Sequence, residues 1–129
     1  MEILLDTHIF LWYISGDPRL PSSTLNLIRD PQNEAFLSSI SVWEILVKHQ
    51  LGKLPIPQPP GKYIPLQRDR HHIKSLPLDE ASVTQLPLLP QLHRDPFDRM
   101  LMCQAMHNEL VFASTDRAIL EYAAFISII

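Results

Sequence analysis

The sequence predicts a three-layer α/β/α fold in which helices cover both faces of a parallel sheet of about four to five strands. The first observation behind this prediction is that short apolar runs alternate with longer helical segments along the chain, which is typical of parallel strands joined by helical crossovers. The second is size, because 129 residues with 46% hydrophobic content can bury a core without cross-links. We therefore expect one domain spanning residues 1–129.

The N-terminal half supplies two strands, each followed by a helix. The apolar run at 2–5 predicts a buried strand, and the turn-forming sequence SGDP at 15–18 ends the helix that follows it. A second apolar run predicts the next strand, and Gly52 is a stop signal for the helix after it. In chain order the expected elements are a strand over 2–5, a helix over 7–14, a helix over 21–29, a strand over 35–39 and a helix over 41–51.

Proline residues limit what the rest of the chain can form. The stretch PIPQPP at 55–60 predicts a stiff extended connector, because proline lacks the N–H that helices and central strands need. Pro65 is tolerable only in the first turn of a helix, and Pro77 confines a strand to a sheet edge. We expect, in order, a short helix over 63–71, an edge strand from 73, a short helix over 79–86, a helix over 96–107, a strand over 110–114, a helix over 117–123 and a strand over 125–128.

Charge and cysteine content exclude some classes of protein. The formal net charge of −3 argues against a general polyanion binder, which usually has a pI above ~9, but not against a nucleic-acid enzyme with metal cations in an acidic centre. Cys103 is the single cysteine, so no internal disulfide can form, and its apolar helical surroundings predict a buried, unreactive thiol. No signal peptide and no apolar segment of ~20 residues is evident, so we expect a soluble, cytoplasmic protein without a membrane partner.

Two groups of basic residues interrupt this mild acidity. Either could meet an anionic partner, and an ordinary solvated surface is an equal alternative for both. The first group is Arg68, Arg70, His71, His72 and Lys74, and the second is His93, Arg94 and Arg99.

Four isolated acids are expected to meet at one edge of the sheet. Asp6 ends the first strand, Glu44 lies just past the second, and Asp116 follows the strand over 110–114. Because the carboxyl ends of parallel strands share one edge, these three acids converge directly from the chain order. Asp98 reaches the same edge if the helix over 96–107 is a crossover into the following strand.

Each acid also has a purely structural explanation. Asp6 and Asp116 could cap the helices that follow them, and Ser41-x-x-Glu44 matches a capping box. Asp95 before Pro96 is the best capping candidate, although a supporting role at the site is an alternative. Four carboxylates at one edge would nevertheless repel one another, and their pKa values would rise unless cations lie between them.

Oxygen ligands without Cys or His at metal-ligand spacing favour Mg²⁺ or Mn²⁺. Two such ions about 3.5 to 4 Å apart can activate water for hydrolysis of a phosphodiester. The proposed catalytic and metal-binding residues are Asp6, Glu44, Asp98 and Asp116, and the residues expected to support the site or contact substrate are Thr7, Asp95, Arg99 and Thr115.

Four motifs together resemble the PIN-domain family, most closely the VapC-like toxins of type II toxin–antitoxin systems. They are LLDTH at 4–8, SVWEILVKHQLGKL at 41–54, LHRDPFDRML at 92–101 and STDRAI at 114–119, in the order and spacing of the family. The resemblance implies a PIN-like fold and an Mg²⁺- or Mn²⁺-dependent endoribonuclease that cuts RNA to leave a 3'-hydroxyl and a 5'-phosphate. It places the family acids at Asp6, Glu44, Asp98 and Asp116, with Asp95 as an extra acid of this variant of the third motif.

The resemblance also implies protein partners, namely a cognate antitoxin and, as is usual in the family, a second copy of the chain. The aromatic segment at 9–14 could form an exposed groove for an amphipathic antitoxin segment, or it could simply fill the core. An antitoxin Arg or Lys that reaches the acidic pocket would stand in for the charge of a metal ion.

Alternative functions stay open at this point. A phosphoacceptor signalling domain also gathers acids at strand ends, but it needs a Lys after a late strand, where this chain has Thr115-Asp116. A phosphatase with an aspartate nucleophile needs a second Asp where this chain has His8. A catalytically silent PIN-like interaction module would be expected to have lost some of the acids, and all four are present.

Overall fold

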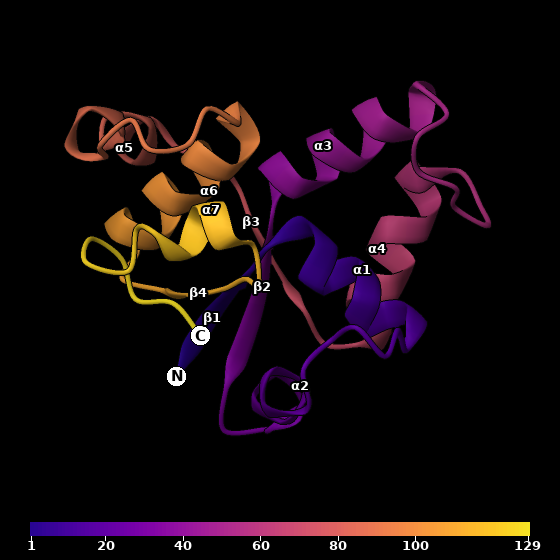
Figure 1. Ribbon diagram of the computed structural model, residues 1–129. Helices are drawn as coiled ribbons and strands as arrows, with labels where there is room; N and C mark the ends of the chain where they lie inside the picture. The colour runs from indigo at the N-terminus through magenta and orange to yellow at the C-terminus, as the bar shows by residue number, and fades with distance from the viewer.

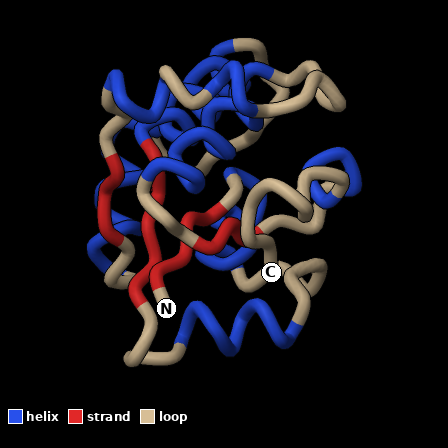
Figure 2. The backbone as a smooth tube through the Cα atoms, turned by 90° about the vertical axis from the view of Figure 1, so that its left-hand side faces the viewer, coloured by secondary structure: helices blue, strands red, loops and turns tan.

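The computed structural model describes residues 1–129 and contains one parallel sheet, so the predicted sheet is confirmed. The strand order is β3-β2-β1-β4, and Figure 2 shows the strands lying side by side. The strands are β1 at Glu2–Leu5, β2 at Glu34–Ser38, β3 at Lys74–Leu76 and β4 at Val111–Ala113. The helices are α1 at Thr7–Ser15, α2 at Ser22–Arg29, α3 at Ser39–Gln50, α4 at Pro60–Arg70, α5 at Glu80–Val83, the 3₁₀ helix η1 at Leu86–Leu88, α6 at Pro96–His107 and α7 at Arg117–Leu120.

Helices cover both faces of the sheet. In Figure 1, α1, α2 and α4 lie on one side of the strands, and α5, α6 and α7 lie on the other. Side chains alternate between the faces of a strand, so Ile3 and Leu5 of β1 enter one buried cluster while Leu4 enters the other. Each of these three side chains is fully buried, which stabilises the fold by about 1.5–3 kcal/mol per residue.

The turn from β1 into α1 shows how the sheet positions a polar residue. Asp6 follows β1 with an extended backbone and caps α1, because its side chain accepts a hydrogen bond from Thr7 N. The backbone N–H of Asp6 donates to Ala113 O at 3.0 Å, which joins the ends of β1 and β4. Gly16 ends α1 in the left-handed conformation, at φ 65°, which a residue without a Cβ adopts at little cost.

The prediction for residues 55–71 is partly wrong. The helix α4 begins at Pro60, the last residue of the expected connector, where the missing proline N–H is harmless. Pro65 therefore lies inside the helix rather than in its first turn. It is tolerated on an exposed face, where water can bind the carbonyl of Gly61 that a proline cannot satisfy. The strand β3 lies at the sheet edge, as Pro77 predicts.

The predictions for two other segments also need correction. The expected helix over 79–86 divides into α5 and η1, with Pro87 inside η1. The expected helix over 117–123 is shorter, and the expected strand over 125–128 reduces to one isolated bridge between Phe112 and Ile128. Ser127 O accepts from Phe112 N at 2.8 Å, so this segment still lies against β4 without extending the sheet.

Cys103 is buried and unpaired in α6, as expected. No helix has both the length and the apolar character that crossing a membrane needs.

Candidate active site

A pocket of about 330 Å³ lies at the carboxyl edge of the sheet, where β1 ends and α3, α6 and α7 begin. Two lysines, Lys48 and Lys53, also line it. Its acidic lining residues are Asp6, Glu44, Asp95, Asp98 and Asp116, so the structure brings the four predicted acids and Asp95 together. The helix α6 runs from this edge back into β4 on the chain, and it therefore acts as the crossover that the placement of Asp98 required.

Asp6 lies at the bottom of the pocket and is held through both carboxylate oxygens. Thr7 N donates to Oδ1 at 2.8 Å, and Ser114 Oγ donates to Oδ2 at 2.7 Å. Asp6 is only 1% exposed. Burial is the largest cause that raises the pKa of Asp6 to about 6, and the charges of Glu44 and Asp116 act in the same direction against the two hydrogen bonds.

Glu44 projects from α3 toward the same position. Thr7 Oγ1 donates to Glu44 Oε1 at 2.6 Å and also lies 2.9 Å from Ser41 Oγ, while Lys48 Nζ lies 2.5 Å from Oε2. The capping-box interpretation of Ser41 and Glu44 is wrong, because α3 begins earlier, at Ser39, and its cap is Ser38. Glu44 thus has no capping role, and its carboxylate is buried in the pocket.

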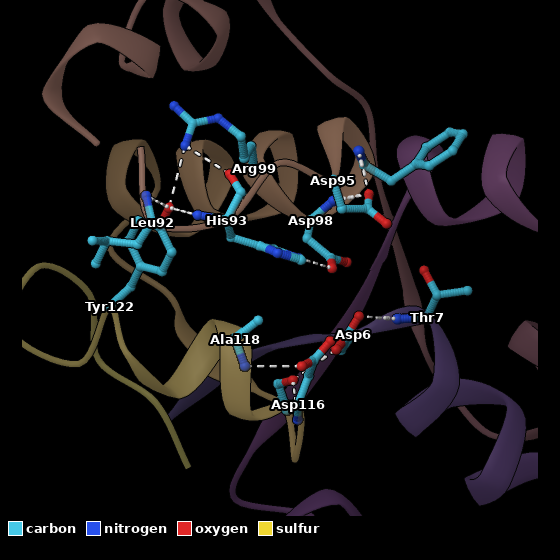
Figure 3. Close-up of polar contacts among 12 residues, drawn as sticks. Asp6, Thr7, Leu92, His93, Asp95, Asp98, Arg99, Asp116, Ala118 and Tyr122 are labelled. Carbon is cyan, nitrogen blue, oxygen red and sulfur yellow. Dashed lines mark hydrogen bonds and ion pairs between the residues drawn. The ribbon is translucent and has the colours of Figure 1, made fainter. Parts of the chain in front are cut away.

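Asp95 and Asp98 have different roles at the start of α6. Asp95 is the N-cap, and its Oδ1 accepts hydrogen bonds from Phe97 N at 2.9 Å and Asp98 N at 3.1 Å. The Asp98 side chain is free of capping and contacts His93, whose Nε2 lies 2.7 Å from Oδ2 (Figure 3). Burial raises the pKa of Asp98 to about 6, against the hydrogen bond from His93 and with support from neighbouring carboxylates, Asp6 first among them.

Asp116 both caps a helix and faces the pocket. Its Oδ1 accepts from Ala118 N at 3.0 Å, so the capping interpretation holds for this residue. Its carboxylate is half-buried beside Asp98 and His93, and ligand atoms from these three residues lie within 4.8 Å of one another. Figure 3 shows the carboxylates of Asp6, Asp98 and Asp116 around the same space.

The supporting residues predicted from the sequence have different positions. Thr7 lies in the pocket, but Thr115 is exposed and is 3.4 Å from His8 Nε2, outside the carboxylate cluster. Arg99 points away from the carboxylates and donates to the carbonyl groups of Pro90 at 3.1 Å and His93 at 3.3 Å. Its role in the structure is to hold the segment that precedes α6.

Lys48, Lys53, His8 and His93 lie at or beside the site and were not among the sequence-based candidates. Lys48 was detectable, because a Glu and a Lys four residues apart on a helix are neighbours. The Nδ1 atom of His8 lies 3.3 Å from Asp6 Oδ2. Burial is the main cause that lowers the pKa of His8. His93 precedes α6, so no helical spacing relates it to Asp98, and its Nε2 nevertheless lies 2.7 Å from Asp98 Oδ2.

The donor set fits a divalent cation. Asp6, Glu44 and Asp98 are 1%, 4% and 8% exposed, and buried carboxylates that lie this close repel one another unless positive charge separates them. Lys48 supplies such charge to Glu44, whereas the pKa values of Asp6 and Asp98 stay raised. Carboxylate oxygens of this kind are the ligands that Mg²⁺ and Mn²⁺ prefer.

The protein is a parallel three-layer α/β domain with carboxylates gathered at the carboxyl edge of its sheet. The sequence profile of the PIN domain matches residues 3–125, so the chain belongs to the PIN domain family.

Individual relatives are similar over different extents. Ribonuclease VapC16 of Mycobacterium tuberculosis (strain ATCC 25618 / H37Rv) is 37% identical over 68 residues, which cover 50% of this chain and 48% of that protein. The match thus spans about half the length of this relative.

Solved structures resemble the chain over nearly its full length. VapBC2 of Rickettsia felis, bound to a DNA fragment from its promoter, has a TM-score of 0.72 at 14% identity. The match covers 100% of this chain and 98% of the chain in that structure. VapBC-1 of nontypeable Haemophilus influenzae has a TM-score of 0.71 at 17% identity, with 100% and 97% covered. At these identities the likeness shows a shared fold.

Proposed function

We propose that this chain is an Mg²⁺- or Mn²⁺-dependent endoribonuclease that acts as the toxin of a toxin–antitoxin pair. The observation that carries the proposal is the convergence of three buried carboxylates, Asp6, Glu44 and Asp98, in one pocket. The repulsion among these carboxylates is relieved only when cations bind among them. The name of one similar protein, a ribonuclease, supports the choice of RNA as substrate.

The chain's own residues would bind the metal and orient the reaction. Asp6, Glu44, Asp98 and Asp116 are the proposed ligands, directly or through water. When bound, a divalent ion lowers the pKa of water and stabilises charge on the phosphate. Thr7 holds Asp6 through its N–H and Glu44 through its hydroxyl, which fixes the two carboxylates relative to each other.

Attack by water, rather than by the ribose 2'-hydroxyl, would leave a 5'-phosphate and a 3'-hydroxyl. A carboxylate of the cluster that does not bind the ion directly would accept the proton of the attacking water. Lys48 Nζ, which is half-exposed at the rim, can also meet a phosphate oxygen.

The test of the proposed function is cleavage of a pool of cellular RNA by the purified protein. We expect cleavage with Mg²⁺ or Mn²⁺, none with EDTA and none by Asp6→Asn, which keeps the size of the side chain. Asp69→Asn, at an exposed position on α4, is the matched control and should cleave like the wild type. Equal cleavage in EDTA, or full activity of Asp6→Asn, would rule out the mechanism.

The surface of α1 supports the proposal of an antitoxin partner. The segment 9–14 divides between core and surface, since Ile9 and Phe10 are buried whereas the four residues that follow are half-buried. Trp12 lies between two pockets of about 460 and 560 Å³, which could take apolar side chains of an amphipathic antitoxin segment.

Copurification with the cognate antitoxin tests this surface. Trp12→Ala should weaken capture, whereas Trp43→Ala, which removes a tryptophan that is 56% exposed on α3, should not. We also propose that the toxin pairs with a second copy, which sedimentation of the purified chain would measure. We also propose a cytoplasmic location, where the protein would meet both RNA and an antitoxin.

A further inference from the structure

The segment before α6 places a nitrogen donor beside the carboxylates of Asp98 and Asp116. His93 Nε2 lies 2.7 Å from Asp98 Oδ2, and ligand atoms of His93, Asp98 and Asp116 lie within 4.8 Å of one another. We propose that His93 is a direct nitrogen ligand of the metal ion that Asp98 and Asp116 bind. The inference rests on the proposed function and refines it, because it names a ligand outside the acidic set and a class of preferred metal.

The backbone that carries His93 is held in position by a buried phenol. Tyr122 is fully buried, and its hydroxyl donates to Pro90 O at 2.7 Å while it accepts from Leu92 N at 3.0 Å and His93 N at 2.9 Å (Figure 3). Arg99 Nη1 lies 3.2 Å from the same hydroxyl and donates to His93 O. The segment is therefore fixed on both sides, and ligands that are fixed before binding lose little entropy when an ion arrives.

The spacing of the donor atoms fits shared coordination. Two adjacent ligands of an octahedral ion with bonds of about 2.1 Å lie about 3 Å apart. The 2.7 Å between His93 Nε2 and Asp98 Oδ2 is close to that separation. Coordination would replace their hydrogen bond, and the neutral imidazole would then keep its proton on Nδ1.

A nitrogen ligand changes which metals the site prefers. Mg²⁺ favours oxygen ligands and water, whereas imidazole binds transition metals such as Mn²⁺ more strongly. We expect the protein to bind Mn²⁺ more tightly than Mg²⁺, and His93→Gln to lower the Mn²⁺ affinity by about 10-fold or more with a smaller effect on Mg²⁺.

His8 is the matched control for this inference. It lines the carboxylate pocket, and its Nδ1 lies 3.3 Å from Asp6 Oδ2. Its Nε2 is directed toward Thr115, and it is not part of the group formed by His93, Asp98 and Asp116. His8→Gln therefore removes an imidazole beside a buried carboxylate without removing the proposed ligand.

Pulsed electron paramagnetic resonance of bound Mn²⁺ detects nitrogen ligands without any need for activity. We expect ¹⁴N coupling in the wild type and in His8→Gln, its loss in His93→Gln, and a ¹⁵N pattern when histidine is ¹⁵N-labelled. Calorimetric titration of the same proteins with Mn²⁺ and Mg²⁺ gives the affinities.

The possible outcomes separate the two proposals. Mn²⁺ bound without nitrogen coupling, or coupling that disappears in His8→Gln and survives in His93→Gln, overturns the role of His93 while RNA cleavage can still proceed. Failure of the wild type both to bind either ion and to cleave RNA overturns the proposed function as well. If His93→Gln does not fold, coupling retained in His8→Gln supports His93, and its loss there contradicts it.

Discussion

The hydroxyl of Thr7 donates a 2.6 Å hydrogen bond to Oε1 of Glu44, and so joins the turn after β1 to the middle of α3. The backbone N–H of the same threonine donates to Asp6 at 2.8 Å. One residue thereby fixes the separation of two buried carboxylates that are 38 positions apart in the sequence (44 minus 6).

We predict that Thr7→Val impairs both metal binding and stability. Valine fills the space but leaves Glu44 Oε1 without its donor, which should cost about 1–3 kcal/mol of stability and about 10-fold or more in metal affinity. Thr7→Ser keeps the hydroxyl and should retain most of both. Calorimetric metal titration and chemical denaturation measure the two effects, and equal metal affinity in Thr7→Val would contradict the prediction.

Without divalent ions, the protein should lose stability as pH rises from about 4 toward 7. The pKa values of Asp6 and Asp98 are raised to about 6 in the folded chain from a normal value of 3.8. Between these values the folded state binds more protons than the unfolded state, so the free energy of unfolding falls as pH increases. His8, whose pKa is lowered, acts in the opposite direction near its normal value of 6.5.

Urea denaturation in EDTA measures how steeply the free energy of unfolding falls across this pH range. The fall should be smaller in Asp6→Asn and in Asp98→Asn. Mg²⁺ or Mn²⁺ should restore stability at pH 7. A metal-free wild type whose stability rises steadily from pH 4 to 6 would contradict the assigned pKa shifts.

We predict that Tyr122→Phe loosens the segment before α6 without opening a cavity. The phenylalanine ring keeps the packing, but Pro90 O loses one of its two donors and the N–H groups of Leu92 and His93 lose their acceptor. The expected loss is about 1–3 kcal/mol of stability. Faster amide hydrogen exchange at residues 92 and 93 than in the wild type is the specific signature, and unchanged exchange there would argue against the clamp.

Lys48→Met should weaken the binding of uncleaved RNA. Lys48 is the cation in contact with Glu44, and its Nζ lies at the rim where a phosphate would approach. Measured in an Asp98→Asn background that does not cleave, the RNA dissociation constant should rise several-fold. Lys62→Met, at an exposed site on α4, should change it little, and an equal effect of the two substitutions would point to nonspecific charge.

The sheet and the meeting of the acids were predictable because both follow from short-range patterns. Apolar runs locate the strands, and a parallel arrangement brings the residues after each strand to one edge, which is where Asp6, Glu44 and Asp116 lie. The rule needs no knowledge of side-chain contacts.

The contacts around His93 were not predictable in the same way. They depend on a phenol 29 residues away, on backbone groups of an irregular segment and on an arginine that had been expected to face the substrate. No periodicity relates these groups, since only the folded packing of α6 and α7 brings them together. The prediction of a strand over 125–128 was wrong for a related reason. An apolar run cannot show that only Phe112 and Ile128 will pair.

The hydrogen bond from Ser114 to Asp6 joins residues 108 positions apart. A ribosome that has made only the first hundred residues has therefore produced a chain in which Asp6 lacks this donor, β1 lacks its neighbour β4, and Asp116 does not yet exist. The nuclease proposed here would remain harmless until Asp116 had been synthesised, and its cell would need to restrain it only after that point.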